Sequence, residues 1–374
     1  MKVAILTYYG ISNYGTQLQA YGLWKFLASR GHEVHFLDEP YGRSMFPYHK
    51  PTIRSFISRH PIRAWRNVLK AYFANKVTQF NVCLPKTQFF SSLDEMAKGL
   101  LGYVAIVVGS DLVWHPKWCS PRYTDIAFLG FAPLGCKRIA ISPSFSATTW
   151  DAPDADKAGA LLGQFDGIGV REKSGIRIVQ EISGRQDANV FIDSALLQPA
   201  STYAKLAAEA KEVGPYVFNY MLSWTNGDAE RKMLTMVKSE LGIKRSEDMY
   251  CFKFDGLGVL AKILGAPRKI LIGDWLRRIM DAKFVFTNSF HGTVFSILFH
   301  RPFVTVLIKG EMSGLNERAI SLAKTLGLED RLLFNDEPER LKSALRSNIN
   351  WDDVDAKLML ERARVSEYLD AFGL

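Results

Sequence analysis

Clustered cysteines and long apolar runs are both missing from this chain, and each absence narrows its class. Its 374 residues include four scattered cysteines, with no CxxC pair: Cys83, Cys119, Cys136 and Cys251. That spacing excludes a zinc knuckle or a disulfide framework and fits a reducing compartment. No window reaches the roughly 18 consecutive apolar residues that a membrane span needs. The first residues are typical of a buried strand rather than a signal peptide, so we expect a cytoplasmic protein.

Several catalytic signatures are also lacking. The sequence has no HxxxH spacing and no G-x-S-x-G elbow. The first strand is followed by neither a GxGxxG fingerprint nor a P-loop. We therefore expect no metal, no bound cofactor and no nucleophilic serine triad.

Acidic residues are absent between Glu39 and Asp94, where nine cations fall: Arg43, Lys50, Arg54, Arg59, Arg63, Arg66, Lys70, Lys76 and Lys86. These nine equal the formal net charge of +9, and such a segment attracts an acidic partner. With its interleaved aromatic residues, it is a candidate for peripheral contact with anionic membrane or a lipid-diphosphate acceptor. A solvated, positively charged helix pair is the alternative. No nucleic-acid motif surrounds these cations, so we expect no nucleic-acid partner.

What is present is an alternation of buried-strand and amphipathic-helix patterns, which is typical of an α/β protein. In the first half, strands are expected at 3–7, 34–37, 104–108, 138–142, 167–170 and 190–192. Their Val and Ile content without strict alternation favours parallel strands covered on both faces. After a polar break, a second series of strands is expected at 216–221, 249–252, 283–287 and 303–308.

This pattern predicts two Rossmann-like, doubly wound domains in tandem. The first spans residues 1–198 and carries the basic insertion at about 43–90, and the second spans 199–374 and ends in closing helices. Parallel α/β sheets bind ligands outside the carboxyl ends of their strands. Functional residues are therefore expected directly after these strands.

The strongest signal is the segment 287–293 (TNSFHGT), between an expected strand and an expected helix. Ser289 falls at the predicted helix N-cap, where free N–H groups and the helix dipole favour an anion such as phosphate. Gly292 would let a ligand approach closely, and Thr293 completes the turn. His291 would stand at the mouth of the cleft. The alternative is a capping serine followed by a core histidine.

Four further signals follow other strands. The first turn contains Asn13, Tyr14 and Gly15, and either binds the acceptor or is an ordinary turn. Asp111 could accept a sugar hydroxyl and Trp114 could stack on a sugar ring, or the two could cap a turn and pack inward.

Arg171 suits bidentate recognition of a carboxylate or phosphate, or pairs with a nearby acid. Lys309 and Arg318 follow the last strand, where a solvated loop is the alternative.

At these positions the sequence resembles the polysaccharide pyruvyl transferase family. The matching pieces span almost the entire chain: NYG at 13–15, LQAY at 18–21, GSD at 109–111 with Trp114, SF at 144–145, VREKSG at 170–175, IDSALL at 192–197, SFHGTVFSI at 289–297, Arg318, and LGL at 326–328 with Arg331. The resemblance implies a fold similar to the two-domain GT-B glycosyltransferases. It also implies phosphoenolpyruvate as donor and co-substrate, and the pyruvylation of sugars of capsules, exopolysaccharides or cell-wall polymers on lipid-linked or nucleotide-linked intermediates.

The same resemblance implies that Arg171 and His291 belong to the donor site. On this hypothesis the phosphate binds at the 289–293 helix end and the carboxylate binds Arg171. His291 is the general acid or base, because its ordinary pKa lies near working pH, and Asp111 orients the acceptor.

Better-known members carry an arginine two positions before the histidine, where this chain has Ser289. Lys309 and Arg318 are the candidates to replace it. A GT-B-type glycosyltransferase that uses a nucleotide sugar is the alternative function.

Overall fold

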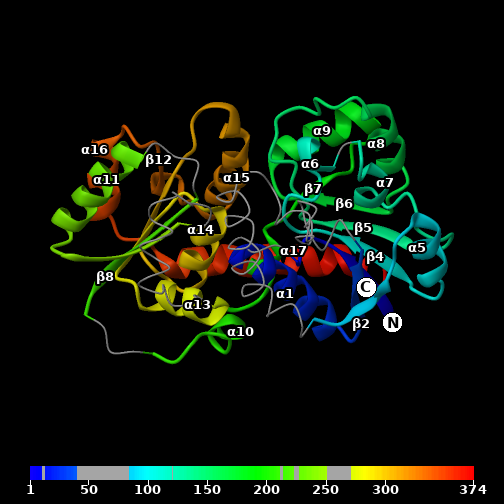
Figure 1. The fold of residues 1–374 in the computed structure, drawn as a ribbon, viewed down its shortest axis with the longest axis horizontal. Helices are drawn as coiled ribbons and strands as arrows, with labels where there is room; N and C mark the ends of the chain where they lie inside the picture. The colour runs from blue at the N-terminus through cyan, green and yellow to red at the C-terminus, as the bar shows by residue number, and fades with distance from the viewer. Residues whose placement is uncertain (11–12, 40–83, 120, 211–213, 223–226, 251–270) are drawn as a thin grey trace, which may run out of the picture.

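The computed structural model describes residues 1–10, 13–39, 84–119, 121–210, 214–222, 227–250 and 271–374. Almost all of the basic segment proposed as a membrane contact lies outside these residues, with Lys86 as the exception. The described chain forms two parallel sheets that lie side by side (Figure 1). The fold is therefore α/β with two Rossmann-like domains, as the sequence predicts.

The first sheet has seven strands in the order β3 (Lys86–Phe89), β2 (Glu33–Asp38), β1 (Lys2–Leu6), β4 (Ala105–Val108), β5 (Lys137–Ile141), β6 (Gly167–Val170) and β7 (Asn189–Val190). All neighbours are parallel, with Val3 of β1 opposite Val34 of β2 and Ala105 of β4. The central strands are buried along almost their whole length. Helices cover both faces, which explains the continuous Val/Ile runs.

The helices of this half follow the strands in chain order: α1 (Tyr14–Ser29), α5 (Leu93–Gly99), α6 (Pro116–Cys119), α7 (Thr124–Ala127), α8 (Ala155–Leu162), α9 (Lys173–Ser183), the 3₁₀ helix η2 (Ser194–Leu197) and α10 (Ala200–Ala204). The N-cap of α1 is Asn13, whose side chain accepts from the N–H groups of Gly15 and Thr16. This cap fixes where the first turn ends.

The second sheet has five strands in the order β12 (Leu332–Leu333), β11 (Phe303–Val306), β10 (Phe284–Thr287), β8 (Tyr216–Met221) and β9 (Arg245–Tyr250). Its helices are α11 (Gly227–Glu240), α13 (Ile272–Asp281), α14 (Phe290–Leu298), η3 (Gly310–Asn316), α15 (Glu317–Leu326), η4 (Glu329–Arg331), α16 (Pro338–Arg346) and α17 (Trp351–Asp370). Most of the strands expected from the sequence are present with small shifts at their ends. The strand expected at 249–252 is the exception, because β9 begins four residues earlier, at Arg245, and residues 251–252 lie outside the described ranges. The short edge strands β3 and β12 were not expected.

The last helix, α17, runs across both halves (Figure 1). Near its start, Lys357 donates to the carbonyl of Leu326 in the second half. Near its end, Arg364 reaches the carbonyl of Val190, and beyond it Lys137 donates to the carbonyl of Phe372. We expected α17 to close the second domain, and the structure shows that it also packs against the first.

The two halves also meet through an apolar core between α1 and the helices of the second sheet. Tyr14 stacks on Trp275 with ring centroids 5.7 Å apart and an interplanar angle of 9°. A Cβ on Gly15 would lie 2.1 Å from Cγ of His291, so only glycine fits there. The interface is therefore closed in front of β1.

Candidate active site

The turn between β6 and α9 places Arg171 at the carboxyl edge of the first sheet. Its buried guanidinium pairs with Asp193, Nη2 to Oδ2, at 2.8 Å. Nε donates to the carbonyl of Ser142 at 3.3 Å, and Nη2 also donates to Ser110. Nη1 has no hydrogen-bond partner within the described part of the chain. Buried polar groups are nearly always hydrogen-bonded, so this unsatisfied N–H group is a candidate donor to a ligand.

Asp193 follows β7 and caps η2, where its Oδ1 accepts from the N–H of Ala195 at 2.8 Å. Its Oδ2 lies 3.7 Å from Nε2 of His291, a contact too long for a hydrogen bond. Burial alone would raise the pKa of this carboxyl. The charge of Arg171, with a smaller contribution from the neighbouring His291, outweighs burial and holds the pKa well below its usual range. Asp193 is therefore an anion at neutral pH that contacts both halves of the molecule.

Arg318, in the first turn of α15, adds a second buried guanidinium. Its Cζ and that of Arg171 each lie 5.1 Å from the ring centroid of Phe290, so one aromatic ring receives two cations. Nη1 of Arg318 is 4.0 Å from Oδ1 of Asp111. Burial and then the like charge of Arg171 lower the pKa of Arg318 to about 10. The like charges repel each other, and an anion bound between them would relieve that repulsion.

The loops that support this cluster have unusual backbone conformations. Asp111, Ser142 and Ser146 have φ values of 66°, 57° and 46°, in the left-handed region that residues other than glycine rarely adopt. Such strained positions cluster at functional sites. Buried Glu172 holds one of these loops, because its Oε1 accepts from the N–H groups of Phe145 at 2.7 Å and Ser146 at 2.9 Å.

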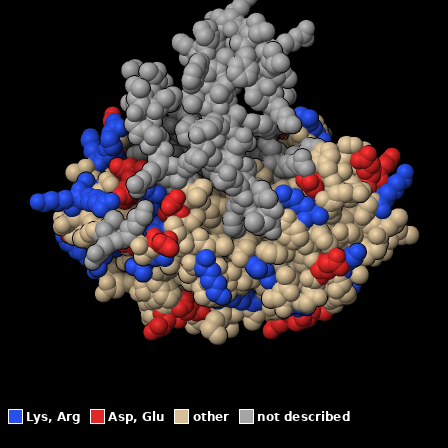
Figure 2. Space-filling model, turned by 60° about the horizontal axis from the view of Figure 1, so that its bottom comes forward, with Lys and Arg blue, Asp and Glu red and all other residues tan. Residues whose placement is uncertain are grey.

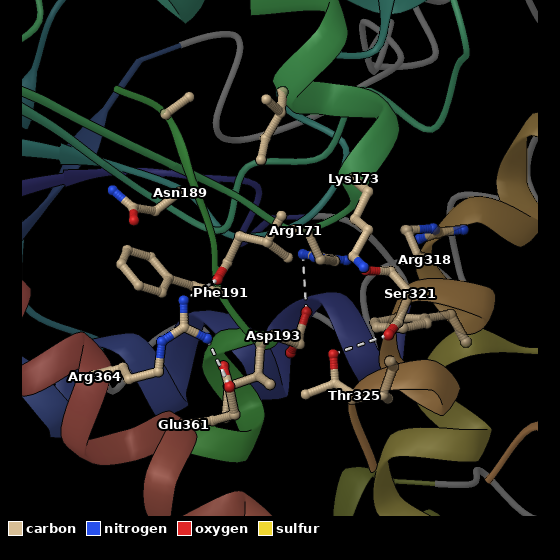
Figure 3. A pocket seen from close by; sticks show the side chains of 16 residues that line it. Arg171, Lys173, Asn189, Phe191, Asp193, Arg318, Ser321, Thr325, Glu361 and Arg364 are labelled. Carbon is tan, nitrogen blue, oxygen red and sulfur yellow. Dashed lines mark hydrogen bonds and ion pairs between the residues drawn. The ribbon is translucent and has the colours of Figure 1, made fainter. Parts of the chain in front are cut away.

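A cavity of about 350 Å³ opens beside the cluster, between the edge of the first sheet, α15 and α17. Figure 3 shows Arg171, Lys173 and Arg318 gathered at one end, with Glu361 and Arg364 on the other side of Asp193. Lys173 is exposed and has no ion-pair or hydrogen-bond partner in the described ranges. We call the first group the cationic end. It can bind a small molecule that carries more than one negative charge.

The two predicted catalytic residues lie behind the cavity wall rather than on it. His291 is 5% exposed and faces Asp193. Asp111 accepts from the hydroxyl of Thr16 at 2.5 Å and lies against Arg318. Both therefore contact residues that line the cavity.

The residues around His291 build the start of α14. Ser289 is its N-cap, as predicted, and accepts from the N–H of Gly292 at 3.3 Å. A Cβ on Gly292 would lie 2.5 Å from Oγ1 of Thr287, so this glycine serves helix–strand packing. Thr293 shares a 2.6 Å hydrogen bond with Thr305. All three are buried, and none lines the cavity.

The residues expected to bind the acceptor are packed into the fold. Asn13 caps α1, and Tyr14 and Gly15 lie against the second half of the molecule. Trp114 takes the inward alternative. It is fully buried, stacks on Phe128 with centroids 5.1 Å apart, and donates to the carbonyl of Ala127 at 2.9 Å. Its ring has no face open to a sugar.

Of the two candidates to replace the family arginine, the cavity includes only one. Arg318 lines it, whereas Lys309 is exposed and pairs with Asp336 at 2.6 Å. Four further residues line the cavity without a role predicted from the sequence: Lys173, Asp193, Thr325 and Arg364. Lys173 and Asp193 lie in the family-like pieces at 170–175 and 192–197, a signal that could have found them. Arg364 lies far along a helix, and no local pattern marks it.

Outside the site, the described residues show little else that suggests function. On the face in Figure 2, Lys and Arg are interspersed with Asp and Glu over the described surface. No group of three or more metal-ligating side chains occurs in the described ranges. Of the helices described, none has the length and apolarity to cross a membrane.

The comparisons with known proteins agree with the fold and identify a family. A family model described as polysaccharide pyruvyl transferase matches residues 13–309. No curated protein is significantly similar in sequence.

Among solved structures, UDP-GlcNAc 2-epimerase from Methanocaldococcus jannaschii matches with 12% identity and a TM-score of 0.52, covering 98% of this chain and 100% of its own. A chain from Listeria monocytogenes described as a UDP-N-acetylglucosamine 2-epimerase matches with 11% identity and a TM-score of 0.52, over 99% and 96%. The calicheamicin glycosyltransferase CalG4 matches with 14% identity and a TM-score of 0.45, over 99% and 98%. The two epimerases support the GT-B-like arrangement of two Rossmann-like domains.

Proposed function

Because the chain belongs to the polysaccharide pyruvyl transferase family, we propose that it transfers the pyruvyl group of phosphoenolpyruvate to a sugar of a surface polysaccharide or its precursor. The observation that carries this proposal is the cationic end of the cavity. Arg171, Lys173 and Arg318 converge there. Asp193 pairs with Arg171 at 2.8 Å, and Asp111 lies 4.0 Å from Arg318.

Phosphoenolpyruvate matches this charge pattern because it carries a carboxylate and a phosphate on a three-carbon frame. The unpartnered Nη1 of Arg171 is a donor for the carboxylate. Arg318 and Lys173 then bind the phosphate, the first as a planar fork and the second as a mobile point charge. This differs from a phosphate bound at the start of α14, whose first turn is buried and closed by Ser289.

We propose that Arg318 takes the role of the arginine that better-known members carry where this chain has Ser289. Its Cζ lies 5.1 Å from the ring of Phe290, the residue between Ser289 and His291. On this proposal, a guanidinium from α15 supplies the cation that the start of α14 lacks. Lys309 does not, since it pairs with Asp336 outside the cavity.

The proposed reaction exchanges the phosphate of the donor for two sugar oxygens. One acceptor hydroxyl bonds to C2, the methylene carbon gains a proton, the C2–O bond to phosphate breaks, and a second hydroxyl of the same sugar closes a ketal. Of the two hydroxyl protons released, one balances the new methyl group and the other leaves with inorganic phosphate. Arg318 and Lys173 stabilise the charge that develops on the departing phosphate.

We propose that His291 carries the proton in this reaction. Its Nε2 lies 3.7 Å from Oδ2 of Asp193. Asp193, whose negative charge is held by Arg171, is then the positioning residue that orients the imidazole. His291→Gln should then change the pH profile of kcat while leaving the affinity for phosphoenolpyruvate within about twofold. An unchanged pH profile would remove His291 from the mechanism.

The direct test is calorimetric titration of the full chain with phosphoenolpyruvate, pyruvate, phosphate and UDP-glucose. We expect phosphoenolpyruvate to bind most tightly and Arg318→Ala to weaken it by about 1.5–3 kcal/mol, the value of a hydrogen bond to a charged group. Lys309→Ala is the matched control and should bind like the wild type. Binding of UDP-glucose without phosphoenolpyruvate would instead establish the glycosyltransferase alternative.

A further inference from the structure

We propose that the end of the cavity between β7, α15 and α17 binds the acceptor, and that this acceptor is an uncharged sugar held by Glu361 and Arg364 with Asn189 and Thr325. We call these four residues the sugar end. The inference rests on the proposed function for the sugar's role as acceptor. The binding itself can be tested without a donor.

The cavity has room for a second ligand beside the donor. The cavity of about 350 Å³ falls in the range of pockets that enclose ligands much larger than a three-carbon phosphate ester. A donor bound by Arg171, Lys173 and Arg318 occupies one end only. Figure 3 shows Arg364 and Glu361 on the opposite side of Asp193 from Arg318. The remaining volume lies beside the donor, where an acceptor must be for its hydroxyls to reach the donor's carbon.

The two ends of the cavity differ in charge. At the cationic end, Lys173 has no partner in the described ranges and Nη1 of Arg171 is unsatisfied. At the sugar end, Nη1 of Arg364 donates to Oε1 of Glu361 at 2.6 Å, so the two charges neutralise each other. A charged acceptor would meet an already paired ion there, and an uncharged one would not disturb it.

The side chains of the sugar end keep hydrogen-bond donors and acceptors that a ligand can use. The guanidinium of Arg364 has more N–H donors than its two bonds, to Glu361 and to the carbonyl of Val190 at 3.4 Å, consume. Thr325 donates its hydroxyl proton to the carbonyl of Ser321 at 3.0 Å, so its oxygen remains free to accept. Asn189 likewise uses its Nδ2, at 3.2 Å from the carbonyl of Asp187, and presents a carbonyl oxygen. Sugar hydroxyls both donate and accept, which suits this mixture.

The test is saturation-transfer NMR on the full chain without donor, using the methyl glycosides of galactose, glucose and mannose, with methyl glucuronide as the charged probe. At least one neutral glycoside should bind, and more tightly than the glucuronide. Glu361→Gln should weaken that binding by about tenfold, the effect of losing one hydrogen bond to a charged group. Arg364→Gln should do the same.

The matched control is Glu367→Gln, an exposed residue on the same helix that does not line the cavity. It should bind sugar like the wild type. The inference is overturned if no neutral glycoside binds, if the glucuronide binds more tightly, or if Glu361→Gln binds as the wild type does. Titration with phosphoenolpyruvate separates the two proposals. Glu361→Gln should bind phosphoenolpyruvate with the wild-type affinity. If the wild-type protein binds the glycoside but not phosphoenolpyruvate, the proposed donor is refuted and the sugar end is not.

Discussion

The turn after β1 and the turn after β6 both lie at the carboxyl edge of the first sheet, but the structure uses them differently. In the first, Asn13 caps α1 and Gly15 is pressed against His291. In the second, Arg171 and Lys173 lie on the wall of a cavity. The strand edge thus predicts where a ligand can bind, while the element that packs on each turn decides whether there is room.

The difference between the two turns comes from the second half of the molecule. Tyr14 and Gly15 meet α13 and α14 through close apolar contacts. Arg171 meets α15, whose Arg318 repels it, and the two guanidiniums share the ring of Phe290. Packing stabilises the first contact. The second carries an electrostatic cost that a bound anion would remove, so mutations should affect the two turns in different measurable ways.

The largest effect should come from breaking the buried pair at the β6 turn. Arg171→Ala leaves Asp193 buried without its cation, which should lower the free energy of unfolding by about 3–5 kcal/mol. Denaturant unfolding measures this loss. Arg171→Ala with Asp193→Asn should recover part of it, because the unpaired charge is gone. If the double variant were no more stable than the single one, the pair would not hold the turn.

The same pair gives the stability a dependence on pH. The pKa of Asp193 is lower in the folded protein than in the unfolded chain, so its contribution is fully present above its unfolded pKa of about 3.9. That contribution is lost as pH falls further toward the folded value. The stability difference between wild type and Asp193→Asn should therefore shrink below about pH 4. A difference that stays constant down to pH 2 would contradict the assigned shift.

Filling the β1 turn should have the next largest effect. In Gly15→Ala the new Cβ would lie 2.1 Å from His291, so the interface must shift, at a cost of about 1–3 kcal/mol. Gly214→Ala is the control, since a Cβ there meets nothing within 4 Å. Thermal unfolding compares the two variants. Equal midpoints would show that the β1 turn is not closed by packing.

Much of this arrangement could be predicted from the sequence, and the limits have physical causes. Val/Ile runs predicted the parallel strands, and Ser289 was placed correctly as the N-cap of α14. Exposure could not be predicted, because burial depends on contacts between segments that are far apart in the chain. Trp114 suits a sugar platform as well as a core, and only Phe128 and Ala127 around it decide for the core. Arg364 reaches the cavity through the path of α17, which no local pattern encodes.

A smaller effect should appear when the cationic end loses its charge at high pH. Because the pKa of Arg318 is lowered to about 10, its cation is present at neutral pH and lost as pH rises through that value. Affinity for phosphoenolpyruvate should fall over the same range. Titration calorimetry in the Lys173→Ala background, which removes the neighbouring amine, isolates this loss. Arg318→Ala in that background should bind weakly and without the alkaline fall, and a fall of equal size there would assign it to another group.

The smallest effect should come from Trp114, which follows β4, the strand beside β1 in the first sheet. Trp114→Phe keeps an aromatic ring against Phe128 but removes the N–H that donates to Ala127, which should lower the free energy of unfolding by about 1 kcal/mol. The KM values for donor and sugar should not change, because Trp114 lies in the core behind the β1 and β4 turns and not on the cavity wall. If Trp114 is a core residue, the variant loses stability and keeps its KM values. If Trp114 stacks on the sugar, the variant keeps its stability and its sugar KM rises. Measuring both quantities on this one variant therefore decides on which side of the interface the sugar binds.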